Sequence, residues 1–312
     1  MDEKMEFRLK TLTPIWTGNV DMKCDRLHET GIIGSIRWWY EALVRGLGGY
    51  ACDPTSKIKE ERCEFDTKSY QKNENLEVEL KKICPACQMF GCTGWGKKIR
   101  WVIDDSSMSK NINTGRTGEF SLFGIEIKAL SDEEKWLVYS VFSIINTYGT
   151  IGGKCMLKPS PNHYCDDRGK VIVTQYGFEK PTINIDQIKR SFSEQKRIIE
   201  STGQKISEEW PNLTRFFFSP EESLDAGQFM GLVGLDTYSN FLKGHKGDRR
   251  DPEARANKFA SFKNIGLTDP KQKKFWGYTK DEDEMYDAVK NTLTDDLVLK
   301  KIKTGKEVLD EL

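Results

Sequence analysis

The sequence predicts an α+β protein, because strand-like and helix-like patterns follow one another along the chain. Residues 5–13 alternate apolar and polar side chains, as does a strand with one buried face. Residues 29–49 instead carry apolar side chains at helical spacing and end in glycines. Up to residue 180 the order is strand, helix, strand, strand, helix, strand. This order is typical of a split βαβ domain with a ferredoxin-like, or RRM-like, fold.

The composition is that of a globular protein with a large wetted surface. The chain has 312 residues, enough for one large or two ordinary domains. Its 48 basic and 48 acidic side chains cancel, so only local clusters of charge can argue for nucleic acid. No apolar run approaches the ~20 residues that span a bilayer, and the N-terminus lacks the apolar centre of a signal peptide. We therefore expect a cytoplasmic protein with no membrane partner, whose eight cysteines are thiols or metal ligands.

The helix predicted within residues 29–49 is the element around which the chain is organised. Ser35 is its expected N-cap, since a hydroxyl accepts a hydrogen bond from a free backbone N–H of the first turn. A helix with this many apolar residues must be mostly buried. Trp39 lies on its apolar arc, whereas Trp38 lies at the border of that arc and is a candidate for stacking on a nucleobase. We expect its two arginines to emerge along a polar seam. The seam consists of Arg37, Glu41 and Arg45.

The remaining elements of the first domain, expected over residues 1–180, follow in order. Strands are predicted over residues 97–103, 118–129 and 169–178. Ser131 and Glu134 form a capping-box pattern, which predicts a second amphipathic helix over 132–146. Between the first helix and the second strand, residues 50–96 are expected to be an insertion, since the segment up to residue 80 is polar and charged.

Residues 181–312 are expected to form a second α+β half, which we interpret as another RRM-like unit. Its hydrophobic patterns are weaker than those of the first half. Helices are predicted over residues 185–202 and 281–294. Strands are predicted over residues 213–219, 229–235 and 259–265.

A cysteine set in the insertion predicts a structural zinc site. Cys84 and Cys87 form a C-x-x-C motif, from which two thiolates can bind one metal ion. Cys52 and Cys63 lie upstream and complete a four-thiolate set, with Cys92 as an alternate ligand. The insertion has little apolar material, so a metal ion would supply stability that it otherwise lacks. The alternative is a redox-active pair, although no thioredoxin-like pattern surrounds the motif.

A basic strand is the first of two features that point towards nucleic acid. Lys97, Lys98 and Arg100 lie beside Trp95 and Trp101. Basic residues next to aromatic ones fit a nucleic-acid surface, where attraction of phosphate and stacking of bases combine. An ordinary edge strand with solvated lysines is the alternative interpretation.

A glycine-rich turn is the second feature. Gly152 and Gly153 precede Lys154, and the backbone of such a turn can approach a phosphate closely. Lys158 adds a second positive charge. The turn matches neither the P-loop motif nor the dinucleotide-binding motif, so we exclude both functions. A glycine-rich hairpin without a ligand fits the same residues.

Three motifs together resemble the RAMP superfamily of CRISPR proteins. They are TPIWTG at residues 13–18, IGSIRWWYEAL at 33–43 and CPACQMFG at 84–91. The turn at Gly149–Lys154 occupies the place of the glycine-rich loop of that superfamily. Within it, the sequence is most similar to the first-numbered subunit of the type III-B (Cmr) effector complex.

The resemblance implies a guide-RNA-binding, non-catalytic subunit of an antiviral RNA-targeting complex. Its expected partners are the guide RNA near the 3′ region, the target RNA and other effector-complex subunits. The residues expected to contact RNA come from the helix, the basic strand and the glycine turn. They are Ser35, Arg37, Trp38, Arg45, Lys97, Lys98, Arg100, Gly152, Gly153, Lys154 and Lys158.

An endoribonuclease of the same system is the alternative function. In related backbone subunits, an aspartate between the first strand and the first helix cuts target RNA with a divalent metal ion. Asp21 and Asp25 occupy the matching loop here, and ordinary loop acids are the plainer interpretation. His28, just before the helix, is a candidate general base for guide processing.

Overall fold

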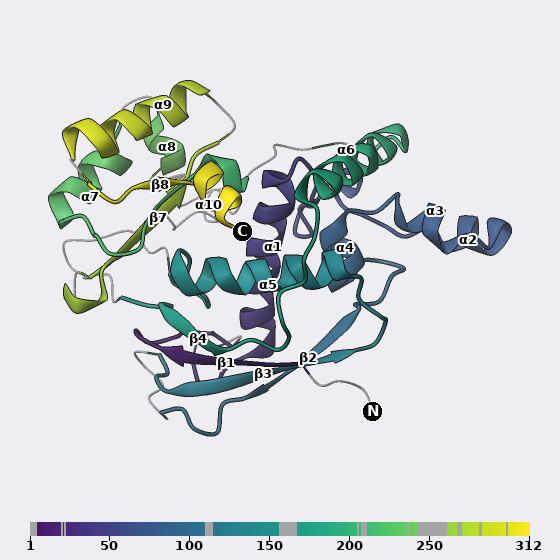
Figure 1. Cartoon of the computed structure of the whole chain (residues 1–312), viewed down its shortest axis with the longest axis horizontal. Coiled ribbons are helices and arrows are strands. Elements are labelled where there is room, and N and C mark those ends of the chain that lie inside the picture. Colours follow the sequence, from purple (N-terminus) through teal and green to yellow (C-terminus); the bar gives the residue numbers. More distant parts are fainter. Residues whose placement is uncertain are drawn as a thin grey trace.

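The computed structural model describes most of the chain and confirms the α+β class. Two four-stranded antiparallel sheets are each accompanied by helices (Figure 1). The described residues are 5–19, 21, 23–109, 115–155, 167–204, 206, 211–235, 238–242, 261–266, 270–280, 283–297 and 299–312. Within this part of the chain, no helix combines the length and the apolar character that a bilayer crossing needs.

The first sheet has the ferredoxin-like topology that the sequence predicted. Its strands are β1 (Met5–Thr11), β2 (Ile99–Asp104), β3 (Glu119–Glu126) and β4 (Val171–Gln175). Their order in the sheet is β2-β3-β1-β4, with every neighbour antiparallel. Helices α1 (Glu29–Gly46) and α5 (Asp132–Thr147) lie on the same face of this sheet (Figure 1). The capping box of Ser131 and Glu134 is present at the start of α5.

The second sheet repeats this topology, as expected of a second RRM-like half. Its strands are β5 (Phe216–Ser219), β6 (Phe262–Ile265), β7 (Lys274–Tyr278) and β8 (Lys303–Thr304), in the order β6-β7-β5-β8. The residue at which the two halves divide stays a prediction. The helices of this half are α7 (Ala226–Val233), α8 (Ser239–Leu242), α9 (Asp283–Asn291) and α10 (Gly305–Glu311). Short turns of helix occupy Leu213–Arg215, Pro270–Gln272 and Thr292–Asp296.

One predicted strand of the second half is wrong. Residues 229–235 were expected to be extended, but most of them belong to α7. The local cause is a capping box, in which the Asp225 side chain accepts from the backbone of Gln228 and the Gln228 side chain accepts from the backbone of Asp225. The strand predicted over 259–265 is present as β6, and its first two residues lie outside the described part.

The insertion forms short helices rather than an irregular loop. They are a 3-10 turn at Lys59–Glu61, α2 (Thr67–Asn73), α3 (Leu76–Leu80) and α4 (Pro85–Phe90). Helices α2 and α3 project away from the body of the molecule, whereas α4 lies beside α1 (Figure 1). Helix α6 (Ile185–Ser201) follows the first sheet and buries Ile188, Phe192 and Ile199.

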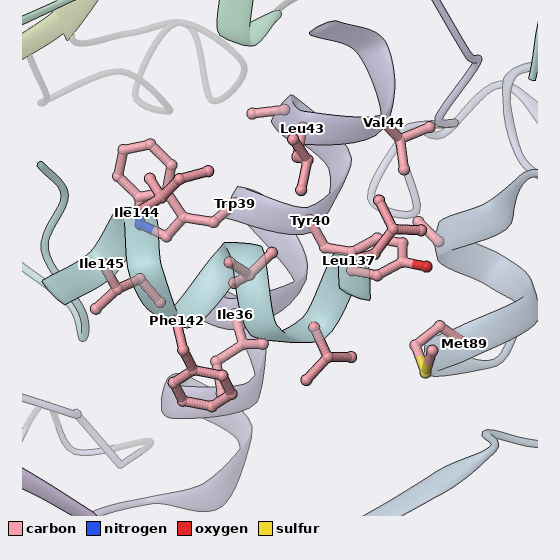
Figure 2. Packing of buried hydrophobic residues seen from close by; sticks show 14 of the residues in the cluster. Ile36, Trp39, Tyr40, Leu43, Val44, Met89, Leu137, Phe142, Ile144 and Ile145 are labelled. Carbon is pink, nitrogen blue, oxygen red and sulfur yellow. The ribbon is translucent and has the colours of Figure 1, made fainter. Parts of the chain in front are cut away.

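Helix α1 is buried from several sides at once. Its side chains interleave with those of α5, and Met89 of α4 lies at the edge of the same cluster (Figure 2). The ring N–H of Trp39 donates to the Thr150 carbonyl at 2.9 Å, and its ring packs 5.1 Å from that of Trp276 in β7. Because one cluster contains residues of both sheets, the two halves share a core.

A buried lysine also links the two halves. The Nζ atom of Lys274 in β7 donates to the carbonyls of Gly149 and Asn146 at 3.0 and 3.4 Å, where α5 ends. Burial, and to a smaller extent the charge of Lys170, lowers the pKa of Lys274 to about 7. Two acceptors match the two N–H groups of a neutral amine, which is therefore the form that the folded protein favours above pH 7.

Lys274 should make the stability of the protein rise with pH above 7. Between a folded pKa of about 7 and the ordinary value of 10.5, the unfolded chain binds one more proton than the folded chain. The free energy of unfolding then increases by about 1.4 kcal/mol per pH unit. Urea unfolding at several pH values should show this increment in the wild type and not in Lys274→Met. Lys273→Met, at the exposed neighbouring position, should keep the increment, and equal slopes for the wild type and Lys274→Met would contradict the assignment.

Candidate functional site

The structure brings Cys52, Cys63, Cys84 and Cys87 together. All four are buried, and their Sγ atoms lie within 4.8 Å of one another. Helix α4 positions two of them, because it begins at Cys84, whose sulfur accepts from the Cys87 backbone N–H at 3.4 Å. Cys52 follows α1, and Cys63 comes from the insertion, where its sulfur accepts from the Cys84 backbone N–H at 3.3 Å. The cluster therefore joins the insertion to the central helix.

The spacing of the sulfurs fits a shared ion better than disulfides. Cys52 Sγ lies 3.4 Å from that of Cys87 and 3.9 Å from that of Cys84, whereas a disulfide bond is about 2.05 Å long. Ligands at about 2.3 Å from a tetrahedral ion are about 3.8 Å apart. The neighbouring thiols raise the pKa of Cys52 and Cys87, because a second thiolate at this distance is unfavourable without a cation. Cys92 lies outside the group of four, although a hydrogen bond with Cys87 lowers its pKa.

Arg37 connects α1 to the cysteine cluster. Its Nε donates to Glu41 at 2.7 Å, its Nη1 to the Gly91 carbonyl at 3.2 Å and its Nη2 to Cys87 Sγ at 3.4 Å. Burial raises the pKa of Glu41 to about 7, and the charge of Arg37 opposes that rise. The guanidinium thus donates its hydrogen bonds to groups inside the protein.

Arg45 does not emerge along a polar seam, so that expectation was wrong. The residue is only 7% exposed. Its Nε and Nη2 donate to the Ala51 carbonyl at 3.2 and 2.7 Å, and its Nη1 donates to the Pro211 carbonyl at 3.1 Å. Two segments that follow α1 in the chain, one close to it and one remote, thus meet at the last turn of the helix, and the guanidinium supplies donors to carbonyls that would otherwise lack them. Glu41 is paired with Arg37 instead of Arg45.

Ser35 is not the N-cap of α1. The helix begins at Glu29 after an N-cap at His28, so Ser35 lies inside it. The Ser35 hydroxyl donates to the Gly31 carbonyl at 3.1 Å and accepts from the Gly152 N–H at 3.0 Å. The residue therefore fixes the glycine turn against the first half of α1, a role that the spacing of caps in a sequence does not reveal.

The glycine turn packs against the loop that follows β1. Gly152 has φ of 94°, and a Cβ there would lie 3.0 Å from the Trp16 carbonyl oxygen. The Gly153 N–H donates to that same carbonyl at 2.7 Å. Both glycine amides are thus engaged within the protein, and close packing requires the glycines. Lys154 Nζ lies 3.8 Å from the centre of the Trp16 ring, and Lys158 falls outside the described residues.

The basic strand is β2, which lies at the edge of the first sheet. Only Arg100 of the three predicted basic residues lies in the strand, since Lys97 and Lys98 precede it. Lys97 and Arg100 are exposed, whereas Lys98 forms an ion pair with Glu134 of α5 at 2.7 Å. Trp101 is buried in the core, so it is not available for stacking. Trp38 is half-buried and packs on the second sheet, with its ring 5.9 Å from Phe216 and 5.7 Å from Tyr278.

In the loop before α1, Asp25 pairs with His28, whereas Asp21 lies apart from them. His28 Nε2 lies 2.7 Å from Asp25 Oδ1, and the hydrogen bond with His28 lowers the pKa of Asp25. Asp21 is exposed, and its backbone N–H donates to the Asn19 side chain. Among the described residues, the cysteine group is the only one with the ligands and spacing for a metal ion.

Lys128 is a residue that the sequence did not single out. Its Nζ lies 3.4 Å from the centre of the Trp95 ring and donates to the Gly96 carbonyl at 3.1 Å. The contact depends on the register of β2 and β3, which brings the ends of the two strands together. In the sequence, Lys128 stands near the end of the alternating pattern at residues 118–129. That position gives no indication that its partner is Trp95.

Replacing Arg37 should destabilise the fold. An Arg37→Ala variant leaves Glu41 buried without its cation, which typically costs ~3–5 kcal/mol of unfolding free energy. Urea unfolding measures this loss, and Arg190→Ala on the exposed face of α6 is the matched control, expected to change stability little. If Arg37→Ala were as stable as Arg190→Ala, the structural role of Arg37 would be wrong.

Comparison with known proteins supports one family. Residues 8–157 match the sequence model of the RAMP superfamily, a range that starts in β1 and ends just beyond the glycine turn. No match is found among the curated proteins.

Two similar solved structures cover nearly the whole chain. One is the crystal structure of Cmr1 from Pyrococcus furiosus (apo form), at 12% identity over 97% of this chain and 98% of that chain, with a TM-score of 0.40. The other is a chain of the type III-B Cmr-beta complex bound to cognate target RNA and AMPPnP, at 11% identity over 96% of this chain and 100% of that chain, with a TM-score of 0.44. These distant likenesses assign no function, and the family rests on the sequence match. Residues 8–157, just under half of the chain, are thus identified as a RAMP-superfamily domain.

Proposed function

We propose that the chain is a guide-RNA-binding, non-catalytic subunit of a type III-B CRISPR RNA-targeting complex. The RAMP match over residues 8–157 carries the proposal, since it includes α1, the cysteine cluster and the glycine turn. The motifs at residues 33–43 and 84–91 favour the first-numbered subunit of that complex. Its partners would be the guide RNA near the 3′ region, the target RNA and the other subunits, with antiviral defence as the biological role.

The cations that face solvent are the best candidates for phosphate contacts. Arg100 on the edge strand and Lys97 just before it are exposed, and Lys154, half-buried over the Trp16 ring, is a third candidate on the glycine turn near the start of α1. Arg37, Arg45 and Lys98 instead donate to groups of the protein itself. We therefore place the RNA contacts of this chain on the first group. Because the net charge is zero, other subunits would supply much of the remaining interface.

We also propose that the four clustered cysteines bind a structural zinc ion. Four buried sulfur ligands around one point are the usual structural zinc set. Backbone N–H groups already donate to the sulfurs of Cys63 and Cys84, which is the kind of support that orients metal ligands. The Arg37 guanidinium beside Cys87 would offset part of the thiolate charge. Zinc would thus hold the insertion to α1.

An endoribonuclease is the second candidate, and the Asp25–His28 contact favours it. A carboxylate that orients a histidine is the usual arrangement for a general base. The pair stands at the start of α1, where the His28 backbone N–H donates to Thr17, the neighbour of the Trp16 that the glycine turn contacts. For metal-dependent cleavage, Asp21 or Asp25 would act with the divalent metal ion.

The purified protein should contain about one zinc ion per chain, measured by elemental analysis. A Cys84→Ser/Cys87→Ser variant should lose the zinc and unfold at a lower temperature, because the insertion loses its attachment to α1. Cys92→Ser should keep the zinc, since its sulfur lies outside the cluster. A wild-type chain that folds normally without zinc would exclude the metal site.

Neutralising Lys97, Arg100 and Lys154 should weaken RNA binding by the assembled complex. In a Lys97→Ala/Arg100→Ala/Lys154→Ala variant, the slope of log affinity against log salt should fall by about 2, since each phosphate contact with single-stranded RNA contributes about 0.7. Lys189→Ala/Arg190→Ala/Arg197→Ala removes the same charge from the exposed face of α6 and should leave the slope unchanged. Equal slopes in the two triple variants would contradict the assignment.

The same complex separates the two candidate functions. Incubation with labelled RNA, with and without Mg²⁺, should show no cleavage that depends on this chain. Cleavage that disappears in Asp25→Ala or His28→Ala would establish the endoribonuclease instead, and a requirement for Mg²⁺ would identify the metal-dependent form.

A further inference from the structure

A cavity of about 640 Å³ lies where the insertion meets the end of the first sheet. Its size falls in the range of small-molecule sites, which is about 300–1,000 Å³. One wall comes from the insertion, and the other comes from the ends of β2 and β3. The residues that matter here are Phe65, Tyr70, Leu76, Trp95, Lys98 and Lys128.

Three aromatic rings are held in place along this cavity. Phe65 is buried, and its ring lies 6.0 Å from that of Tyr70 and 5.4 Å from that of Trp95. The Trp95 ring N–H donates to the Gln88 carbonyl at 2.9 Å, which fixes the indole. Lys128 already occupies one face of Trp95. Tyr70, at 36% exposed, is therefore the ring with the most surface free for stacking.

The charge of the cavity is positive. Among the described residues that line it, two are lysines and none is acidic. The charge of Lys98 is compensated by Glu134. The Gly96 carbonyl and the Trp95 ring that Lys128 contacts are both neutral, so its charge remains to attract an anion. Lys97, exposed between Trp95 and the start of β2, adds to the same potential.

We infer that this cavity receives one unstacked nucleobase of single-stranded RNA, with the base against Tyr70 and Leu76 and its phosphate near Lys128. A planar base with an adjacent anion matches both the exposed apolar surface and the sign of the charge. Recognition of splayed bases by aromatic side chains is common in RNA-binding proteins. The inference rests on the proposed RNA-binding function and adds a base-binding site in the insertion.

The test compares RNA binding by the full-length chain, isolated with the subunits that co-purify with it. The probe is a fluorescent single-stranded RNA of the guide length. Tyr70→Ala should weaken binding by roughly 5-fold to 100-fold, the usual effect of losing one base–aromatic stack. Lys128→Gln should weaken it and lower its salt dependence. Tyr70→Phe keeps the ring and should bind as the wild type does, and Lys189→Gln on α6 is the matched charge control.

Each outcome of these binding measurements supports or overturns either the base site or the proposed function. Photocrosslinking of 4-thiouridine RNA to the insertion, together with weaker binding by Tyr70→Ala at unchanged melting temperature and subunit content, supports the inference. Normal RNA binding by Tyr70→Ala and Lys128→Gln overturns the base site and leaves the proposed function intact. Absence of RNA from the wild-type complex overturns the proposed function. Loss of a protein subunit in Tyr70→Ala shows that a protein side chain fills the cavity and overturns the inference.

Discussion

The burial of α1 between several neighbours is the constraint on which the rest of the structure depends. Trp38 and Trp39 pack against aromatic residues of the second sheet, and Tyr40 meets Phe90 of α4 edge-on at 5.3 Å. The space is tight, since a Cβ on Gly149 would lie 2.5 Å from the Trp39 ring. Loss of a tryptophan from such a core typically costs ~3–5 kcal/mol. One helix therefore determines how both halves and the insertion are placed.

A helix enclosed in this way must satisfy its polar side chains internally. Arg37 does so by meeting Glu41 and the cysteine cluster, and Arg45 does so through two carbonyls. Residues that look like an anion-binding stripe in the sequence are thus structural supports. The surfaces that we propose for RNA are the exposed edge of the first sheet around Lys97 and Arg100, Lys154 on the glycine turn and the cavity beside the insertion, all of which lie outside the enclosed helix.

Much of the first half could be predicted, because burial of one face imposes a period on strands and helices. The order of those elements also specified the topology of the sheet, and the C-x-x-C spacing located the cysteine cluster. The environment of Arg45 could not be predicted, since one of its acceptors, Pro211, is remote in the sequence. The error at residues 229–235 had a local signal, the Asp225 capping box, which outweighs an apolar run too short to distinguish helix from strand.

The shared aromatic core affects how the protein is made. The first half leaves the ribosome before β5 and β7, which cover Trp38 and Trp39. At a synthesis rate of ~5–20 residues per second, roughly 10 to 50 s pass between the synthesis of those rings and that of β7, and during this time the nascent chain cannot complete its core. Sheet formation in the first half and closure of the core are therefore separate events in time. During that interval the nascent chain exposes aromatic surface of the kind that chaperones bind.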